Sequence, residues 1–527
     1  MFLGGCGLPE VWQDKTHYTI GELGFGSGLN FLTTWQMWDQ SLDAKTGNSI
    51  KPRLHFISIE KFPFNSAQLK QALGAWPELA PYAAQLIKAW PQRVKGFHRL
   101  DFGRVTLTLI HDDIGAALDA LDARIDAWFL DGFSPAKNPD MWSPQIMQKL
   151  AKLSAPQARL ATFTVAGTVR QALQEAGFTV EKKTGFGRKR HRLEARLNSP
   201  AANPKMPPPA TPTIIGSGIG GASLARAFLR RGITPRIITS PNHHAASGNA
   251  AALIKPRLDL QDRPESRFFL ASYLYALRTY TQTDGVISKG VTQFPKTDKE
   301  AARFEKLVSQ APLPRAHIGF EDGAMQLPQA LTICPKDVLA QWLEGADIEA
   351  QHITDFDRLD GPVFAAMGYG IKPLLGADNP PLRYSRGQIS WAQANDKIRG
   401  AVSYGGYALP VNGKILLGAT HDRLSGDDPY CLIPADDARN FAQFESVMGY
   451  GLEPLNRAIM PPRASVRVTT PNTLPMILNA QPNQYILSGL GSRGFVFAPL
   501  LAEAIVCHWL GEPMPIAKTI WARFGPR

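Results

Sequence analysis

The chain has 527 residues, and because one domain typically holds about 100–200 residues, a single small binding module is excluded. With 44% hydrophobic and 19% charged residues it can bury several cores, which excludes wholesale disorder. The formal net charge of +12 predicts a positive surface field that favours nucleic acid or acidic substrates as partners. A solvated basic surface without a polyanion partner would give the same charge.

The sequence also predicts a cytosolic protein without a metal centre or a membrane span, and no obligate protein partner is inferred from it. No apolar run approaches the ~20 residues that cross a bilayer, and the first residues lack the charged start and long apolar segment of a signal peptide. Leu3-Gly4-Gly5-Cys6 faintly resembles a lipoprotein cleavage box, but no such apolar segment precedes it. The cysteines show neither metal-ligand nor redox-pair spacing: Cys6, Cys334, Cys431 and Cys507.

A proline-rich stretch, residues 198–212, divides the chain and is expected to be a semi-rigid linker. Upstream, strands alternate with helical segments, which predicts a mostly parallel, covered sheet in a domain over 1–197. The expected strands are 18–23, 54–59, 105–110, 127–130 and 160–164. The second domain, 213–527, begins with a strand at 213–215, and mixed periodicity from 259 to 463 predicts an inserted substrate-side sheet. The predicted fold class is therefore α/β in both halves.

The first expected strand runs into a glycine loop followed by an apolar helix. The loop reads Glu22-Leu23-Gly24-Phe25-Gly26-Ser27-Gly28-Leu29-Asn30. Glycine at every second position permits positive φ and lets the backbone approach a ligand, although a purely structural turn uses glycine in the same way.

Acidic residues follow the later strands of this half in order. Glu60 follows the second strand, where a carboxylate can accept hydrogen bonds from both hydroxyls of a ribose. Asp112 and Asp113 follow the third, and Asp131 follows the fourth. Any one of them would be ordinary on a solvated turn, but the series predicts a nucleotide-type site at one edge of the sheet.

Several stretches of this half resemble the methyltransferase half of a family of bifunctional tRNA-modifying enzymes that complete 5-methylaminomethyl-2-thiouridine. They are Phe-Leu-Asp-Gly-Phe-Ser-Pro-Ala-Lys-Asn-Pro-Asp-Met-Trp at 129–142, Leu-Ala-Thr-Phe-Thr at 160–164, Gln-Glu-Ala-Gly-Phe at 174–178 and Gly-Phe-Gly-Arg-Lys-Arg at 185–190. The resemblance implies a Rossmann-like domain that binds S-adenosylmethionine. The donor would be held by Glu22, Gly24, Gly26, Gly28, Asn30 and Glu60, with Asp112 and Asp113 near the adenine.

The resemblance also implies that Asp131 is the catalytic residue beside the transferring methyl group. An alkyl amine with a pKa of ~10 is mostly protonated at neutral pH, so its lone pair must be released before it attacks the methyl donor. Asp131 would accept or orient that proton. The family has more chain before the glycine loop, so we expect part of its N-terminal portion to be missing here.

A second glycine loop, Gly216-Ser217-Gly218-Ile219-Gly220-Gly221, lies between a strand and an apolar helix, as the dinucleotide fingerprint requires. The pyrophosphate would lie at the helix N-terminus, where free N–H groups and the helix dipole favour an anion. The next strand, 236–239, does not end in the acid that usually binds the ribose, so a hydroxyl or a backbone group would have to replace it.

Stretches of the second half resemble the flavin-dependent oxidoreductase half of the same family. They are Ala-Ser-Gly-Asn-Ala-Ala at 246–251, Lys-Pro at 255–256, Tyr-Ser-Arg-Gly-Gln at 384–388 and Gly-Leu-Gly-Ser-Arg-Gly at 489–494. The resemblance implies FAD and a D-amino-acid-oxidase-like fold with an inserted mixed α+β substrate domain. The FAD-binding residues would be Gly216, Ser217, Gly218, Gly221, Ser247, Gly248, Asn249, Gly489, Gly491, Ser492, Arg493 and Gly494.

By this resemblance the substrate is a wobble uridine of tRNA carrying a 5-carboxymethylaminomethyl group, often 2-thiolated. The flavin half would remove hydride from the carbon between amine and carboxylate, and water would cleave the resulting imine to leave an aminomethyl group and release glyoxylate. The other half would then methylate the freed amine. An arginine fork could hold the carboxylate. The candidates are Arg386, Arg463, Arg467 and Arg493, each of which could equally be a surface or structural residue.

A basic run at the end of the first half predicts contact with RNA phosphates, with the target base turned out of its loop. Its members are Lys182, Lys183, Arg188, Lys189, Arg190, Arg192 and Arg196. A solvated strand edge would explain the same run. Two other functions remain open: a flavin-dependent amino-acid oxidase fused to a methyltransferase for small molecules or protein amines, and a catalytically silent tRNA-binding scaffold.

Overall fold

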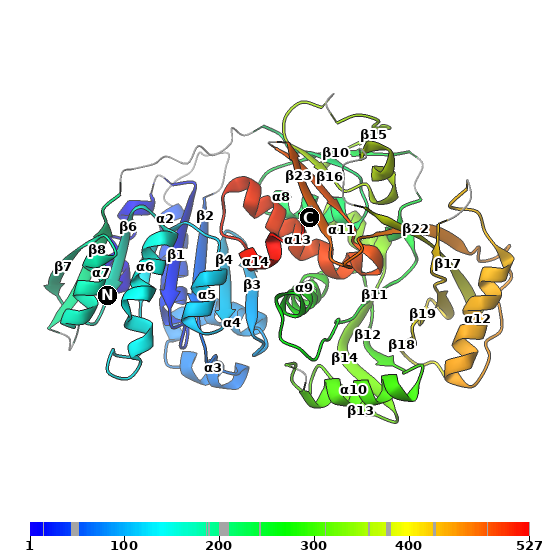
Figure 1. The fold of residues 1–527 in the computed structure, drawn as a ribbon, viewed down its shortest axis with the longest axis horizontal. Helices are drawn as coiled ribbons and strands as arrows, with labels where there is room; N and C mark the ends of the chain where they lie inside the picture. The colour runs from blue at the N-terminus through cyan, green and yellow to red at the C-terminus, as the bar shows by residue number, and fades with distance from the viewer. Residues whose placement is uncertain are drawn as a thin grey trace. The chain divides into compact units, whose positions relative to one another are not determined.

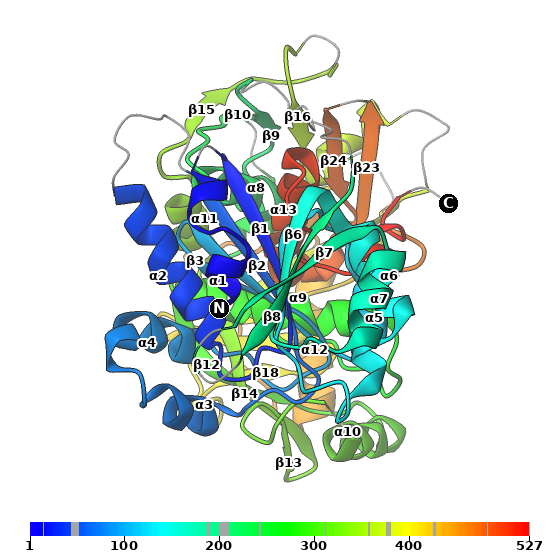
Figure 2. The ribbon, with the colours of Figure 1, turned by 90° about the vertical axis from the view of Figure 1, so that its left-hand side faces the viewer.

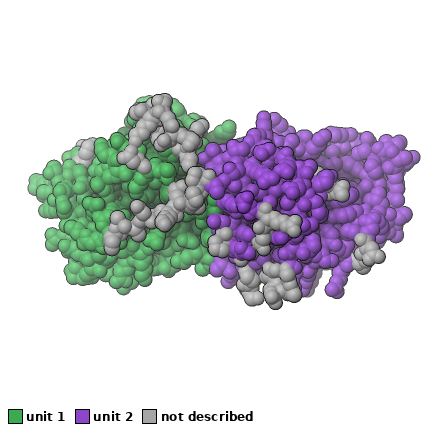
Figure 3. All heavy atoms as spheres, turned by 90° about the horizontal axis from the view of Figure 1, so that it is seen from above, with its two compact units in different colours: residues 1–208, 507–519 green, residues 209–506, 520–527 purple. Residues whose placement is uncertain are grey.

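The computed structural model describes residues 1–13, 15–43, 52–185, 187, 190–199, 210–241, 244–310, 312–356, 359–375, 381–424, 428–481 and 483–525. The chain divides into two compact units (Figure 3). Unit 1 comprises residues 1–208 and 507–519, and unit 2 comprises residues 209–506 and 520–527. The segment 507–519 therefore groups with unit 1, whereas the composition of the chain gave no reason to separate it from 213–527.

Unit 1 contains an eight-stranded sheet in the order β3-β4-β2-β1-β5-β6-β8-β7 (Figure 1). The neighbours from β4 through β6 are parallel, whereas β3, β8 and β7 run antiparallel to the strands beside them. The strands are β1 (His17–Leu23), β2 (Arg53–Ile59), β3 (Gly96–Phe102), β4 (Val105–His111), β5 (Ile125–Leu130), β6 (Ser154–Thr162), β7 (Phe178–Thr184) and β8 (His191–Leu197). Because β1 lies between β2 and β5, the chain order reverses there, and the carboxyl end of β1 is where such sheets bind ligands.

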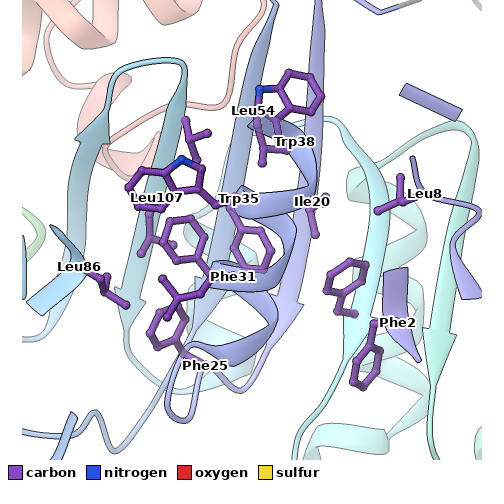
Figure 4. Packing of buried hydrophobic residues seen from close by; sticks show 14 of the residues in the cluster. Phe2, Leu8, Ile20, Phe25, Phe31, Trp35, Trp38, Leu54, Leu86 and Leu107 are labelled. Atoms are coloured by element: carbon purple, nitrogen blue, oxygen red, sulfur yellow. The ribbon is translucent and has the colours of Figure 1, made fainter. Parts of the chain in front are cut away.

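Helices cover both faces of this sheet (Figure 2). One face carries α2 (Leu29–Asp43), α3 (Ser66–Leu73) and α4 (Ala80–Ala89), and the other carries α5 (Ile114–Ala120), α6 (Pro144–Leu153) and α7 (Gly167–Glu175). Phe31, Trp35 and Trp38 recur at helical spacing and pack toward the sheet from α2 (Figure 4). On β2, Phe56 belongs to the α2-side core and Ile57 to the opposite core, as expected where strand side chains alternate.

Unit 2 contains a six-stranded sheet in the order β15-β10-β9-β16-β24-β23, in which only the β23–β24 pair is antiparallel. The strands are β9 (Thr213–Ile215), β10 (Arg236–Thr239), β15 (Asp347–Ala350), β16 (Val363–Ala365), β23 (Met476–Gln481) and β24 (Gln484–Ser488). Strand β9 lies between β10 and β16 and leads into α8 (Ile219–Leu229). This places the second glycine loop at another reversal of strand order.

A second, mixed sheet fills much of the region for which the sequence predicted a substrate-side sheet. Its order is β11-β14-β12-β18-β19-β20-β17-β21, with β13 paired to β14 and β22 paired to β17. The strands are β11 (Ala252–Ile254), β12 (Val286–Gln293), β13 (Gly319–Glu321), β14 (Ala324–Ile333), β17 (Arg383–Gln393), β18 (Ala401–Ser403), β19 (Tyr407–Val411), β20 (Lys414–Gly418), β21 (Asp422–Arg423) and β22 (Arg463–Thr469). The longer helices that accompany the two sheets are α9 (Pro264–Tyr280), α10 (Asp298–Gln310), α11 (Pro335–Leu343), α12 (Pro434–Met448) and α13 (Gly494–Leu510).

One helical segment differs from the expectation that no apolar stretch reaches membrane-spanning length. Among the described residues, Gly491–Leu510 is 20 residues long and apolar enough to cross a membrane by length and composition alone. Within the protein, 72% of this window is buried. Such burial is typical of the central helix of a globular core, which passes the same test.

Candidate active sites

The glycine loop of unit 1 lies at the carboxyl end of β1, with its glycines in the left-handed region of φ. Gly24, Gly26 and Gly28 have φ of +91°, +54° and +76°. A Cβ on Gly24 would lie 3.1 Å from the carbonyl oxygen of Asp131, whereas a Cβ on Gly26 would meet no atom within 4 Å. The loop is therefore packed against the end of β5 at Gly24 and open at Gly26, as a ligand-binding turn requires.

Glu60 connects this loop to the segment after β2. One carboxylate oxygen accepts the Gly26 N–H at 3.1 Å, and the other accepts the Phe62 N–H at 2.8 Å. The structure thus brings together Gly26 and Glu60, which the sequence predicted to hold the same nucleoside.

Glu22, Asn30 and Asp131 form a hydrogen-bonded chain. The Asn30 side-chain amide donates to Glu22 at 2.9 Å and to Asp131 at 2.8 Å, and the Ser58 hydroxyl donates to Glu22 at 2.7 Å. Glu22 is 1% exposed, and burial raises the pKa of its carboxyl to about 8. A buried carboxyl already occupied by two partners is better suited to orient Asn30 than to contact a ligand itself.

Asp131 lies at the carboxyl end of β5, where its side chain remains exposed at the edge of the site. Surrounding protein nonetheless removes part of its hydration, and this desolvation raises the pKa of its carboxyl, against the opposing effect of the Asn30 hydrogen bond. A carboxylate that is accessible, oriented and more basic than usual can accept a proton from an amine.

The two acids after β4 pair with lysines that no sequence motif marks. Asp113 caps α5 by accepting the Gly115 N–H at 3.0 Å, and Lys61 lies 3.2 Å from its carboxylate. Asp112 is buried and lies 3.1 Å from Lys95. The partners of each pair come from different segments of the chain, so no local sequence pattern predicts these pairs.

The basic run of unit 1 is only partly described. Lys182 and Lys183 lie on β7, the last strand of the sheet, and are exposed, as is Arg190. Lys183 pairs with Glu181, and the Arg192 Nε donates to Glu194 at 2.7 Å. Arg188 and Lys189 lie outside the described residues.

Unit 2 contains a cavity of about 1300 Å³ around the second glycine loop. It collects predicted residues from three distant segments: Gly216, Ser217 and Gly218, then Ser247 and Asn249, and finally Gly489, Gly491, Ser492, Arg493 and Gly494. Gly221 and Gly248 do not line it. A Cβ on Gly221 would lie 1.7 Å from the Gly216 carbonyl oxygen, so this glycine serves the close packing of α8 on the loop.

The α8 N-terminus faces this cavity and fits a pyrophosphate. Gly218 is the N-cap residue, and the Ser247 hydroxyl accepts the Ile219 N–H at 3.0 Å. Thr239, at the end of β10, also lines the cavity, and its hydroxyl lies 2.7 Å from the Ser217 hydroxyl. A hydroxyl therefore stands where the dinucleotide fingerprint usually has an acid.

The candidate carboxylate-binding arginines occupy different environments. Arg467 and Arg493 line the cavity. Arg463 instead donates to Asn249 at 2.8 Å and to the Ala245 carbonyl, which tethers the loop that carries Ser247. Arg386 is 5% exposed and forms an ion pair with Asp436. The structure thus brings two of the four arginines to the cavity and gives the other two structural partners.

Lys255 is a cavity residue for which the sequence pattern alone predicted no role. Its ammonium nitrogen lies 2.8 Å from the Gln293 side-chain oxygen and 2.8 Å from the Ser403 hydroxyl. Burial, together with the charge of Arg493, lowers its pKa to about 8. Ser403 and Tyr407 also line the cavity, but they come from β18 and β19 and carry no sequence motif.

Comparisons with known proteins assign a cofactor-dependent family to each half of the chain. The family model for S-adenosyl-L-methionine-dependent methyltransferases matches residues 77–198, and the model for FAD dependent oxidoreductases matches residues 213–507. The cofactors are therefore S-adenosylmethionine and FAD. Among solved structures, the iminodiacetate oxidase of Chelativorans sp. BNC1 is 18% identical, covering 60% of this chain and 98% of its own, with a TM-score of 0.49.

Curated relatives match over almost the whole chain. The tRNA 5-methylaminomethyl-2-thiouridine biosynthesis bifunctional protein MnmC of Caulobacter vibrioides is 38% identical over 99% of this chain and 90% of its own length. The protein of the same name from Maricaulis maris is 36% identical over 98% of this chain and 89% of its own length. At this identity and coverage, the chain belongs to the family of bifunctional enzymes of tRNA 5-methylaminomethyl-2-thiouridine biosynthesis.

Proposed function

We propose that this enzyme shortens and then methylates the same exocyclic arm of a wobble uridine in tRNA. Its substrate is the 5-carboxymethylaminomethyl group of uridine or 2-thiouridine, and its product is the 5-methylaminomethyl group. We assign methyl transfer to residues 1–197 and oxidation to residues 213–527, joined by the linker 198–212. The observation that carries the proposal is that each half places its glycine loop at a reversal of strand order, beside residues suited to one of the two chemistries. A tRNA substrate implies a cytoplasmic enzyme.

When bound, FAD accepts hydride from the carbon between amine and carboxylate, and S-adenosylmethionine supplies the methyl group. For the first step the chain must hold the carboxylate. Arg467 is suited to this because it lines the cavity and its guanidinium is already oriented by an N–H donated to the Thr420 carbonyl at 3.2 Å. A guanidinium has five donors in a planar fork, so it can still bind a carboxylate through two of them.

Lys255 is suited to accept the proton of the substrate amine before oxidation. With a pKa lowered to about 8, this lysine is neutral, with a free lone pair, more often near neutral pH than an ordinary lysine is. Gln293 and Ser403 fix the position of its nitrogen. In the second step, Asp131 would accept the proton of the primary amine, while Asn30 and Glu22 hold its carboxylate in place.

The proposal is tested with purified protein and tRNA that carries the carboxymethylaminomethyl group, followed by nucleoside mass analysis. Without S-adenosylmethionine we expect the aminomethyl nucleoside, and with it the methylaminomethyl nucleoside. Asp131→Asn should stop at the aminomethyl stage, with methyl transfer about 10²- to 10⁴-fold slower.

Arg467→Met should slow the first step by about tenfold or more, because a charge-assisted pair with the carboxylate is lost. Rapid oxidation of free glycine, with the tRNA arm left unchanged, would support the amino-acid oxidase alternative instead.

A further inference from the structure

A smaller cavity adjoins the flavin cavity of unit 2, and we call it the outer pocket. Its volume is about 680 Å³, and its lining includes Lys372, Arg383, Tyr384, His421 and Arg423. Lys372 and His421 also line the flavin cavity. The two spaces therefore meet at these two residues, and whatever occupies the outer pocket lies directly beside the flavin cavity.

The outer pocket is strongly basic. Lys372, Arg383 and Arg423 are all exposed, and no Asp or Glu belongs to the lining among the described residues. Asp422 is the nearest acid in sequence, but its carboxylate is bound by both terminal nitrogens of Arg439, at 2.8 and 2.9 Å. Three cations that share a concave surface, with no Asp or Glu among its described lining residues, attract an anion with several charges.

A series of aromatic rings leads from the outer pocket into the flavin cavity. The Tyr384 ring lies 5.4 Å from that of Tyr369, which lies 6.5 Å from Tyr430, and Tyr430 stacks on His244 at 4.2 Å. Tyr384 lines the outer pocket, whereas the other three line the flavin cavity. Cations interleaved with aromatic faces are the combination by which proteins bind single-stranded nucleic acid, through phosphates and stacked bases.

Lys372 belongs to both features of the pocket. Its ammonium nitrogen lies 5.5 Å from the centre of the Tyr384 ring and 5.8 Å from that of Tyr369. The cation therefore sits beside two ring faces. A phosphate bound there would be adjacent to a surface on which a base could stack.

Arg467 lies close to the junction of the two cavities. It lines the flavin cavity and donates to the Thr420 carbonyl, and Thr420 precedes His421, which lines both cavities. A substrate arm whose carboxylate binds Arg467 would thus be held close to the outer pocket, where the nucleotides attached to that arm could contact its lining.

We infer that the outer pocket is where the unpaired anticodon loop of the RNA enters the flavin site. Lys372, Arg383 and Arg423 bind its phosphates, and Tyr384 stacks on a base that neighbours the modified one. This inference rests on the proposed function, since it assumes that the substrate arm is attached to RNA. It adds a second RNA-contacting surface, separate in sequence from the basic run of unit 1.

The test measures the affinity of the flavin-loaded full-length protein for an unmodified anticodon stem-loop RNA over a range of salt concentrations. Arg383→Gln and Arg423→Gln should each weaken binding and reduce the slope of log K against log salt by ~0.7, the value for one phosphate contact on a single strand. Arg303→Gln is the matched control, because Arg303 is exposed on α10 and lines neither cavity. Its slope should equal that of the wild type.

Tyr384 tests stacking separately from charge. Tyr384→Ala should weaken RNA binding by about fivefold to a hundredfold without a change in slope, whereas Tyr384→Phe should bind as the wild type does. Unchanged slopes for both arginine variants would overturn the inference. Loss of bound flavin from these variants, measured by absorbance, would also overturn it, because the pocket would then serve the cofactor. If polyglutamate competed for binding in the pocket and RNA did not, the pocket would instead bind an acidic protein.

The same experiment separates this inference from the proposed function. RNA binding that depends on these residues, in a protein that leaves the modified arm unchanged, would support the pocket and contradict the proposed function. If the enzyme converted the arm but its RNA affinity were unchanged by all three substitutions, the result would support the proposed function and contradict the role of the outer pocket.

Discussion

Glu22 is a buried carboxyl whose protonation links the Asp131 site to pH. Its pKa is about 8 in the folded protein and near 4.5 in an unfolded chain, so the folded state retains a proton that the unfolded state has lost between these values. The stability of unit 1 should therefore fall as pH rises from about 5 to about 8. Glu22→Gln, which keeps a neutral group of the same shape, should remove this decline. Thermal unfolding of the wild type and of Glu22→Gln across this pH range measures the decline. If the stability of both proteins changed with pH in the same way, the role of Glu22 would be contradicted.

A second prediction concerns Lys255 and the pH dependence of the flavin step. Burial and Arg493 lower the pKa of its ammonium to about 8, while Glu300 acts in the opposite direction. If the neutral amine accepts the substrate proton, the flavin step should accelerate as pH rises through about 8. Lys255→Met should be slow and should lose this titration while it retains flavin. A Lys255→Met variant with the wild-type pH profile would exclude Lys255 as the proton acceptor.

At the scale of elements, the contact between the second glycine loop and α8 tolerates no side chain at Gly221. A Cβ there would lie 1.7 Å from the Gly216 carbonyl oxygen. Gly221→Ala should lower the free energy of unfolding of unit 2 by about 1–3 kcal/mol and reduce its flavin content. Gly400→Ala is the control, since a Cβ on Gly400 meets nothing within 4 Å. Denaturant unfolding and the flavin-to-protein absorbance ratio measure both variants, and equal results for the two would contradict this packing role.

The elements that carry the sites were predictable because their signals are local. Strand patterns, alternate glycines and the acids after strands located the loops around Gly26 and Gly218 and the position of Glu60. The partners that orient them were not predictable, because they arrive from distant strands: Ser403 lies 148 positions from Lys255, and Asp436 lies 50 positions from Arg386. The environments of the candidate arginines were not predictable either, because motif and charge alone do not distinguish a guanidinium in a cavity from one in a buried ion pair.

At the scale of the whole molecule, two ligand sites on separate units serve consecutive steps on one substrate arm. Separate sites predict separable losses: a substitution at Asp131 should spare oxidation, and one at Arg467 should spare methylation of a substrate that already carries the aminomethyl group. The unit to which 507–519 belongs was not predictable, because its place depends on tertiary packing. Glu512 of this segment lies 3.7 Å from His55 on β2.

If both chemistries act on one nitrogen atom, a single nucleoside should carry labels from both steps. This expectation is tested most directly with tRNA whose carboxymethylaminomethyl arm carries ¹⁵N, incubated with the enzyme and S-adenosylmethionine bearing a deuterated methyl group, followed by nucleoside mass analysis. We expect a 5-methylaminomethyl nucleoside that contains both labels, with the ¹⁵N retained through the oxidative step. A methylated nucleoside without ¹⁵N, or an arm that keeps its carboxymethyl group in the presence of flavin-loaded enzyme, would contradict it.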